Sequence, residues 1–117
     1  MSFKFEKLII WQKAMDFGEE IFEISKKFPK LELYNLSTQI LKAGDSIALN
    51  ISEGSIEQSN KEFNRFLGYS VRSLAEVVTC LYKAKRRKYI SDENFKSLYD
   101  RSYHLMNMII SFKTKLK

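Results

Sequence analysis

Apolar residues recur along this chain at alternating steps of three and four residues, the spacing that places side chains on one face of an α-helix. Four runs follow this spacing and predict helices over about 7–28, 36–54, 60–88 and 92–116. The stripe positions are, run by run, Ile10, Ala14, Phe17, Ile21, Ile24 and Phe28; Leu36, Ile40, Ala43, Ile47, Asn50 and Gly54; Phe63, Leu67, Ser70, Leu74, Val77, Leu81 and Ala84; and Phe95, Leu98, Ser102, Leu105, Ile109, Phe112 and Leu116. In the first run, Trp11, Met15 and Phe22 are expected to widen the same face.

Residues with capping chemistry mark the predicted helix ends. Pro29 stops the first helix, and Asn35 is the expected N-cap of the second. Gly54 is the expected left-handed residue that ends the second helix. The third helix starts from a capping box, in which Ser59 is followed three residues later by Glu62.

These elements predict an all-α fold made of one domain over residues 1–117. Ser91 caps the fourth helix, and no alternating strand pattern occurs. Short connections make sequential helices antiparallel neighbours, which gives an up-down-up-down four-helix bundle. The spacing near 3.5 residues also predicts a left-handed twist.

More apolar residues are present than one bundle core requires. The surplus lies on the third helix and at the start of the first, in Phe66, Tyr69, Val71, Val78, Tyr82, Leu8, Ile9 and Trp11. Such a surplus favours a surface covered by another subunit. The alternative is that single exposed apolar residues are ordinary surface.

Composition indicates a globular protein in a reducing compartment. Hydrophobic residues make up 44% and aromatic residues 14% of the 117 residues. The lone Cys80 cannot form an internal disulfide, which favours a cytoplasmic location. No membrane span and no signal peptide are expected, because no apolar run is long enough and the N-terminus is charged throughout.

The residues offer little for catalysis or metal binding. The only histidine, His104, has Arg101 three positions before it, so the Glu-x-x-His pairs of bundle metal sites are missing. We therefore expect no metal, no cofactor and no enzymatic activity. An RNA-processing enzyme that uses Arg101 and His104, which share one helix face, is the remaining catalytic alternative.

Polar residues gather at the corner between the second and third helices, in Ser46, Asn50, Glu53, Ser73 and Glu76. One interpretation is that they tie the two helices together and set their register, as single core asparagines do in coiled coils. The other is a catalytic or ligand-binding role.

The net charge of +6 favours a polyanionic partner. Its densest cluster closes the third helix and consists of Lys83, Lys85, Arg86, Arg87 and Lys88. A second group, Lys113, Lys115 and Lys117, should lie at the opposite pole of the bundle. The clusters either complement the helix dipoles in solvent or bind phosphates of nucleic acid.

The corner resembles the motif of the bacterial four-helix bundle proteins called the 23S rRNA intervening-sequence, or S23, family. The matching residues are Ser46, Ile47, Asn50, Ile51, Glu53 and Gly54, followed by Ser59, Glu62, Phe63, Phe66 and Leu67. Further matches are Trp11, Ala14, Phe28-Pro29, Leu36 to Gln39, Ser73 and Glu76. The resemblance covers roughly residues 5 to 110.

The resemblance implies a non-enzymatic homo-oligomer, a ring-like pentamer, that works with RNA or an RNA-bound protein. A similar protein is the accessory variability determinant of diversity-generating retroelements. This chain departs from the family pattern where arginines are usual: Glu57 and Gln58 occupy the corner, Leu41-Lys42 precedes the alanine, and Arg72 replaces a glycine. These departures move the expected RNA contact to the basic end of the third helix. A protein-interaction scaffold without a nucleic-acid role is the alternative.

Overall fold

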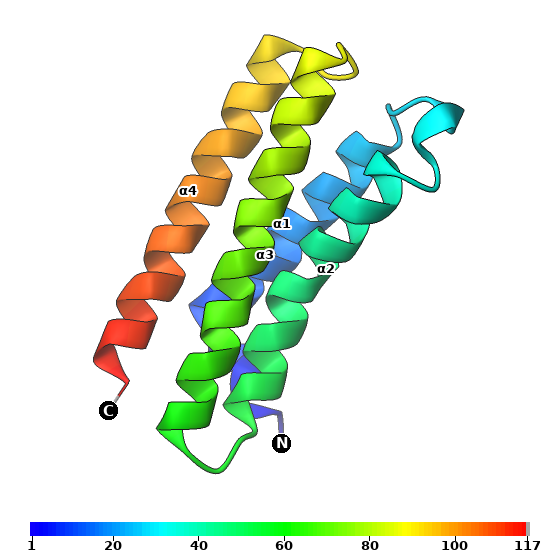
Figure 1. The fold of residues 1–117 in the computed structure, drawn as a ribbon. Helices are drawn as coiled ribbons and strands as arrows, with labels where there is room; N and C mark the ends of the chain where they lie inside the picture. Colours follow the sequence, from blue (N-terminus) through cyan, green and yellow to red (C-terminus); the bar gives the residue numbers. More distant parts are fainter. Residues whose placement is uncertain (117) are drawn as a thin grey trace.

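A computed structural model describes residues 1–116, and Lys117, which was grouped with Lys113 and Lys115, lies outside the described residues. Four α-helices follow one another in antiparallel order, α1 (Ile9–Ser25), α2 (Leu36–Ser55), α3 (Asn60–Arg86) and α4 (Asp92–Lys115). Two short 3-10 turns, η1 (Lys4–Lys7) and η2 (Lys30–Glu32), precede α1 and α2. The predicted all-α four-helix bundle is confirmed (Figure 1), and no strand forms within residues 1–116.

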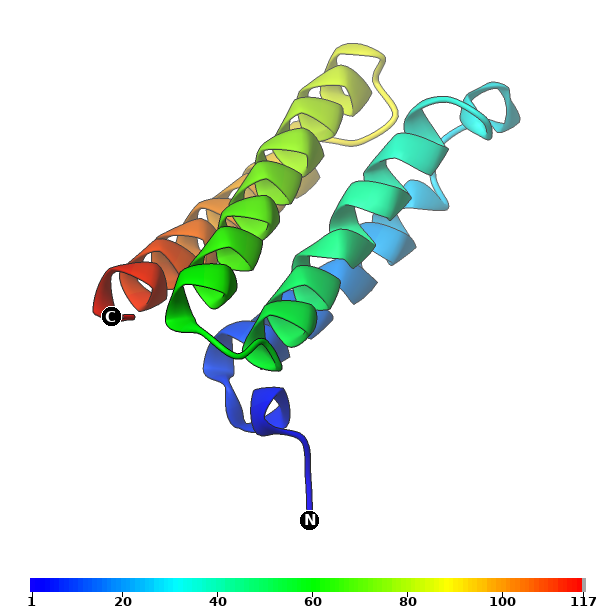
Figure 2. The ribbon, with the colours of Figure 1, turned by 60° about the horizontal axis from the view of Figure 1, so that its bottom comes forward.

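The helices form two layers, α1 with α2 and α3 with α4 (Figure 2). Helices α2 and α3 pack most extensively, and α1 and α4 pack least. The bundle measures 43 × 24 × 23 Å. The connections α1–α2 and α3–α4 lie at one end of the long axis, and the α2–α3 corner lies at the other (Figure 1).

Most of the core comes from the predicted stripes, and Ala48, Ile51, Cys80 and Ile90 are buried in addition. The largest fully buried apolar side chains come from all four helices and are Ile21, Leu36, Ile40, Ile47, Ile51, Leu67, Leu74, Val77, Leu81 and Ile109. Two stripe serines are also buried, and both hydroxyls are satisfied: Ser70 donates to the Ile47 carbonyl at 2.9 Å and Ser102 to the Leu98 carbonyl at 2.8 Å. Ile51 is fully buried while Asn50 is only half-buried, so the last turns of α2 present a slightly rotated face to the core.

Of the three residues predicted to widen the core face of α1, Trp11 packs against the core, whereas the prediction was wrong for Met15 and Phe22. Met15 and Phe22 are 45% and 44% exposed, and Trp11 is half-buried against the ring of Phe5, with centroids 5.1 Å apart. Met15 and Phe22 lie on the exposed flank of α1. They therefore leave apolar surface on the outside of the bundle.

The prediction of a left-handed glycine at Gly54 was also wrong, because no glycine in the described chain has a positive φ. Gly54 lies inside α2, where a Cβ atom would stand 2.6 Å from the Cβ of Phe66 and 2.9 Å from Cδ1 of Phe63. The glycine is required by the close approach of α2 to α3, not by backbone conformation. The left-handed residue is instead Lys88, with φ of 63°.

Helix ends differ from the predictions by a few residues. Helix α1 ends at Ser25, and Phe28 is buried in the following loop, 5.6 Å from Tyr89 between ring centroids. The side chain of Asn35 does not cap α2, as its expected N-cap role required. Ser59 and Ser91 accept hydrogen bonds from the backbone amides of Glu62 and Asn94, as N-caps do. The Glu62 carboxylate pairs with Arg65 at 2.6 Å.

Candidate functional site

The polar corner residues tie α2 to α3 through their serines. The hydroxyls of Ser46 and Ser73 are 2.6 Å apart, and Ser70 bonds the α2 backbone from the same side of α3. The Asn50 side chain donates to the Ser46 carbonyl in its own helix at 2.8 Å. Glu53 is exposed and forms no hydrogen bond with another described residue. The corner thus contains serine hydrogen bonds that join the two helices, and its described residues form no convergent set of reactive groups.

A buried carboxylate lies at the other end of the bundle, and the sequence analysis did not single it out. Glu32, in η2, is 4% exposed. Its Oε2 accepts hydrogen bonds from the Tyr89 hydroxyl at 2.7 Å and from Nη1 of Arg87 at 3.0 Å. Its Oε1 accepts from Nδ2 of Asn35 at 3.0 Å and from the backbone amide of Leu36 at 3.4 Å. The carboxylate therefore caps α2 in place of Asn35 and fastens the η2 loop to the end of α3.

This network shifts the pKa of both acidic groups. The hydrogen bond from Tyr89, aided by Leu36, Asn35 and Arg87, holds the pKa of Glu32 below its ordinary value, although burial opposes the shift. The same bond raises the pKa of the Tyr89 hydroxyl, because ionisation would place two negative oxygens side by side. The ionised carboxylate with a neutral phenol is thus the stable form at neutral pH. Every oxygen of Glu32 is occupied, so the network is structural.

The basic cluster at the end of α3 is divided by this network. Arg87 forms an ion pair with Glu32, whereas Arg86 and Lys88 are exposed and form no ion pair within residues 1–116. Lys85 is half-buried, and its ammonium group lies 4.6 Å from the ring centroid of Phe95. Lys83 is exposed on the preceding turn. The five cations of this cluster therefore differ in role: Arg87 holds the Glu32 network together, and the others remain outside it.

The chain turns sharply after α3 through a Schellman motif. The amide of Tyr89 bonds the Ala84 carbonyl at 2.9 Å and the amide of Lys88 bonds the Lys85 carbonyl at 3.0 Å. The C′ residue of such a motif, which donates the second of these bonds, is left-handed and is usually glycine. Here it is Lys88, whose side chain makes that conformation costly. A lysine thus occupies a position where glycine would be more stable.

The turn borders a hollow between the end of α3 and the start of α4, which we call the α3–α4 pocket. Its volume is about 560 Å³. Three cations, Lys85, Arg86 and Lys88, line it together with Tyr82, Ile90, Ser91 and Asp92. The tyrosine is 45% exposed, so part of its ring is open to the pocket. The pocket combines positive charge with an aromatic wall.

More cations come to this end from the α1–α2 connection. Lys26, Lys27 and Lys30 follow the end of α1, and the ion pair of Glu32 with Arg87 links that connection to the end of α3. The α1–α2 and α3–α4 connections lie at the same end of the bundle (Figure 1). We call this end the basic pole, made of Lys26, Lys27, Lys30, Lys83, Lys85, Arg86, Arg87 and Lys88. Sequence reasoning missed the first three because they lie more than fifty residues before the cluster.

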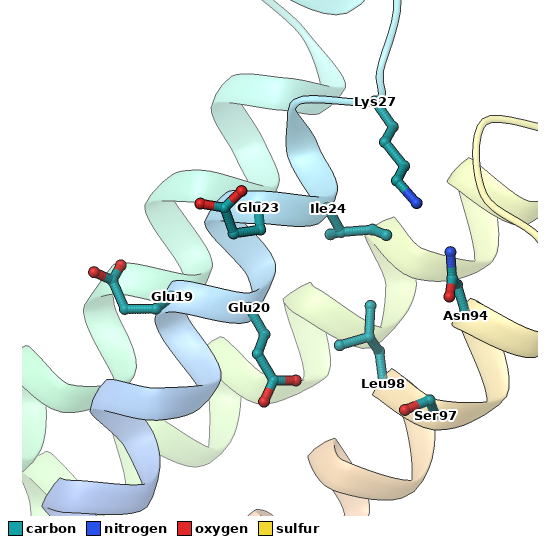
Figure 3. Close-up of a pocket in the computed structure, with 8 residues that line it drawn as sticks. All are labelled: Glu19, Glu20, Glu23, Ile24, Lys27, Asn94, Ser97 and Leu98. Carbon is teal, nitrogen blue, oxygen red and sulfur yellow. The ribbon is translucent and has the colours of Figure 1, made fainter.

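A groove between α1 and α4 extends from this pole and has a volume of about 470 Å³. Figure 3 shows Glu20 and Ile24 of α1 and Lys27 of the following turn extending toward α4, while the carboxylates of Glu19 and Glu23 point away from α4. Glu20 pairs with Arg101 of α4, which lies outside the lining of the groove. The lining of the groove is thus of mixed charge.

The described residues add no further catalytic group to the alternative of an RNA-processing enzyme that uses Arg101 and His104. His104 is exposed, and Arg101 is already paired with Glu20. The adjoining hollow of about 340 Å³ brings Lys13 and Asp16 near them but shows no hydrogen bond between these side chains. Burial raises the pKa of the Cys80 thiol, which makes it a poorer nucleophile. Residues 1–116 contain no group of three or more His, Cys, Asp or Glu side chains that could hold a metal, and none of their helices could cross a membrane.

Comparison with known proteins gives a family match and a structural match. Residues 6–111 match the model of a family described as 23S rRNA-intervening sequence protein. One similar solved structure is a protein with unknown function from the S23 ribosomal protein family of Bacteroides thetaiotaomicron. It shares 26% identity and a TM-score of 0.83, over 90% of this chain and 98% of that one. No curated protein sequence matches the chain.

Proposed function

This chain belongs to the 23S rRNA-intervening sequence protein family, and on that premise we propose that it is a non-enzymatic, oligomeric helical scaffold that binds RNA through its basic pole. The RNA is either the direct ligand or part of a ribonucleoprotein partner. The observation that carries the proposal is the α3–α4 pocket, where unpaired cations surround a hollow surface.

The state of those cations supports phosphate binding. Arg86 and Lys88 are free to contact phosphates, and Lys85 is held in place by the ring of Phe95. Neutralising a phosphate releases condensed counterions, which supplies affinity without base contacts. Arg87 does not contribute, because its charge is matched by the buried Glu32.

The conformation of Lys88 gives independent support. Glycine at a left-handed C′ position avoids the steric cost that a lysine side chain incurs. A residue kept in an unfavourable conformation points to a function for its side chain. For Lys88, that function would be to place its ammonium group at the α3–α4 pocket.

The test compares two doubly substituted proteins with equal loss of charge. Arg86→Gln/Lys88→Gly removes two cations of the α3–α4 pocket, and Lys61→Gln/Lys115→Gln removes two exposed cations at the opposite pole. Binding of a single-stranded RNA is measured by fluorescence anisotropy over a salt series. Each lost phosphate contact should reduce the slope of log affinity against log salt by about 0.7.

We expect the pocket variant to bind more weakly with a shallower slope, and the control to bind like the parent. Equal losses in the two variants would show that only net charge matters. RNA binding that is absent or insensitive to salt would refute the proposal and leave the alternative of a protein-interaction scaffold.

Self-association is proposed from the apolar surface. One shallow groove of about 450 Å³ on the α1–α2 layer is lined by Phe5, Trp11, Met15 and Leu49. Another, of about 280 Å³, on the α3–α4 layer is lined by Val78, Tyr103 and Met106 among others. Two different apolar faces suit a head-to-tail contact that closes into a ring.

The proposed assembly is a homopentamer, with a mass five times the 13.8 kDa of one chain. Light scattering after size exclusion measures that mass directly. Met15→Glu should reduce it, because a charge would then enter the apolar contact. A parent protein that is monomeric at micromolar concentration would refute the ring.

A further inference from the structure

We infer that the α3–α4 pocket holds one unpaired nucleotide, with its base against the ring of Tyr82 and its phosphate on the neighbouring cations. This inference rests on the proposed function and names the class of RNA as single-stranded. The volume of about 560 Å³ lies within the range of pockets that enclose a small molecule.

The aromatic wall of the pocket is already ordered. The ring of Tyr82 meets Phe95 at 4.8 Å and Tyr99 at 6.3 Å between centroids, both in edge-to-face geometry. These contacts hold the ring from the α4 side while 45% of the residue stays exposed. A base that stacks on a fixed ring loses less side-chain entropy on binding. Bases of every type have a π-face, so stacking suits recognition without sequence preference.

Three cations line the same pocket as the ring of Tyr82. Lys85 is positioned by Phe95, and Arg86 and Lys88 lie one and three residues further along the turn. Asp92 also lines the pocket and repels additional phosphates, while its carboxylate accepts hydrogen bonds from the amino groups of bases. The pocket therefore favours a nucleotide within a chain over a free polyphosphate.

Base pairing keeps a duplex from stacking on the tyrosine. Bases in a double helix are paired and stacked on one another, so none is free to cover the ring of Tyr82, whereas bases of loops and single strands can be splayed outward onto it. Duplex RNA would contact only the cations at the rim. The structure thus predicts a preference that charge alone would not create.

The experiment compares a labelled, unpaired RNA of about ten nucleotides with a blunt duplex of the same length, a size typical of single-strand sites. Tyr82→Leu keeps apolar packing on Phe95 but removes the aromatic face, and Tyr82→Phe keeps that face. Tyr34→Leu is the matched control, because Tyr34 is 92% exposed in the turn before α2 and lies outside the α3–α4 pocket.

We expect the parent to prefer the unpaired RNA, and Tyr82→Leu to weaken that binding by roughly 5- to 150-fold, which corresponds to one stacked base. Tyr82→Phe and Tyr34→Leu should bind like the parent. If Tyr82→Leu fails to fold, crosslinking of 4-thiouridine RNA to the parent replaces it, and an adduct on Tyr82 is expected.

Two results would overturn the single-strand inference while leaving the proposed function intact. One is equal, salt-dependent affinity for duplex and unpaired RNA. The other is parent-like binding by Tyr82→Leu, or crosslinks that map only to other residues. If the parent protein shows no salt-dependent binding to either RNA, the proposed function is refuted together with the inference.

Discussion

Replacing Gly54 with alanine tests whether α2 and α3 pack as closely at their shared corner as the structure shows. The added Cβ would lie 2.6 Å from the Cβ of Phe66, an atom fixed to the backbone of α3. It would also lie 2.9 Å from Cδ1 of Phe63, which ring rotation can relieve only in part. The helices must therefore separate at the corner, and overpacking of this kind costs about 1–3 kcal/mol.

A gain in helix propensity offsets part of this cost. Alanine is favoured over glycine by about 1 kcal/mol in a helix interior. Gly54 is the second-last residue of α2, so the gain there is smaller. We expect Gly54→Ala to lower the free energy of unfolding by about 1–2 kcal/mol, the overpacking cost less the propensity gain.

Gly68→Ala is the matched control within the same helical hairpin. Gly68 lies inside α3, and an added Cβ would meet only Nζ of Lys113, at 3.8 Å. Without a clash, the propensity gain of about 1 kcal/mol remains and the variant should be more stable than the parent. The same chemical change is thus predicted to have opposite signs at two sites.

Thermal and urea unfolding followed by circular dichroism measure both variants at one protein concentration, because self-association would otherwise shift the midpoint. A difference of about 2–3 kcal/mol between them corresponds to roughly 10 °C in melting temperature for a domain of this size. Equal stability of the two variants, or a stabilised Gly54→Ala, would refute the close packing of the corner.

Three further predictions follow from the basic pole and the corner. Lys88→Gly alone should raise the free energy of unfolding by about 1 kcal/mol in urea titrations, because it relieves a left-handed lysine; a destabilised variant would contradict that explanation. The pKa of Glu32 is lowered on folding, so its contribution to stability is complete above its ordinary value of 4.5 and is lost as pH falls through the folded value. Glu32→Gln should therefore flatten the stability profile between neutral and acidic pH. Ser70→Ala should cost about 1 kcal/mol, since it removes a fully buried hydrogen bond between α3 and α2, while Asn50→Leu should change unfolding much less, because Asn50 bonds only its own helix.

The sequence alone identified the family motif and the architecture. Helical spacing is a local property, so the four stripes predicted the helices and nearly all of the core, including the buried Ser70 and Ser102. Caps are also local, and Ser59 and Ser91 were recognised for that reason. Short connections then left the antiparallel bundle as the arrangement that buries all four stripes.

The tertiary structure decided which of these residues are available for function. Glu32 meets Arg87 and Tyr89 across 55 and 57 positions of the chain, a separation over which no local pattern carries information. That contact withdrew one arginine from the basic cluster and brought three distant lysines to the same pole. Gly54 likewise owes its role to an approach of two helices that spacing along one helix cannot show. Local periodicity determines which face of a helix is buried, but the use of a charge or a glycine depends on neighbours that only the packed bundle brings together.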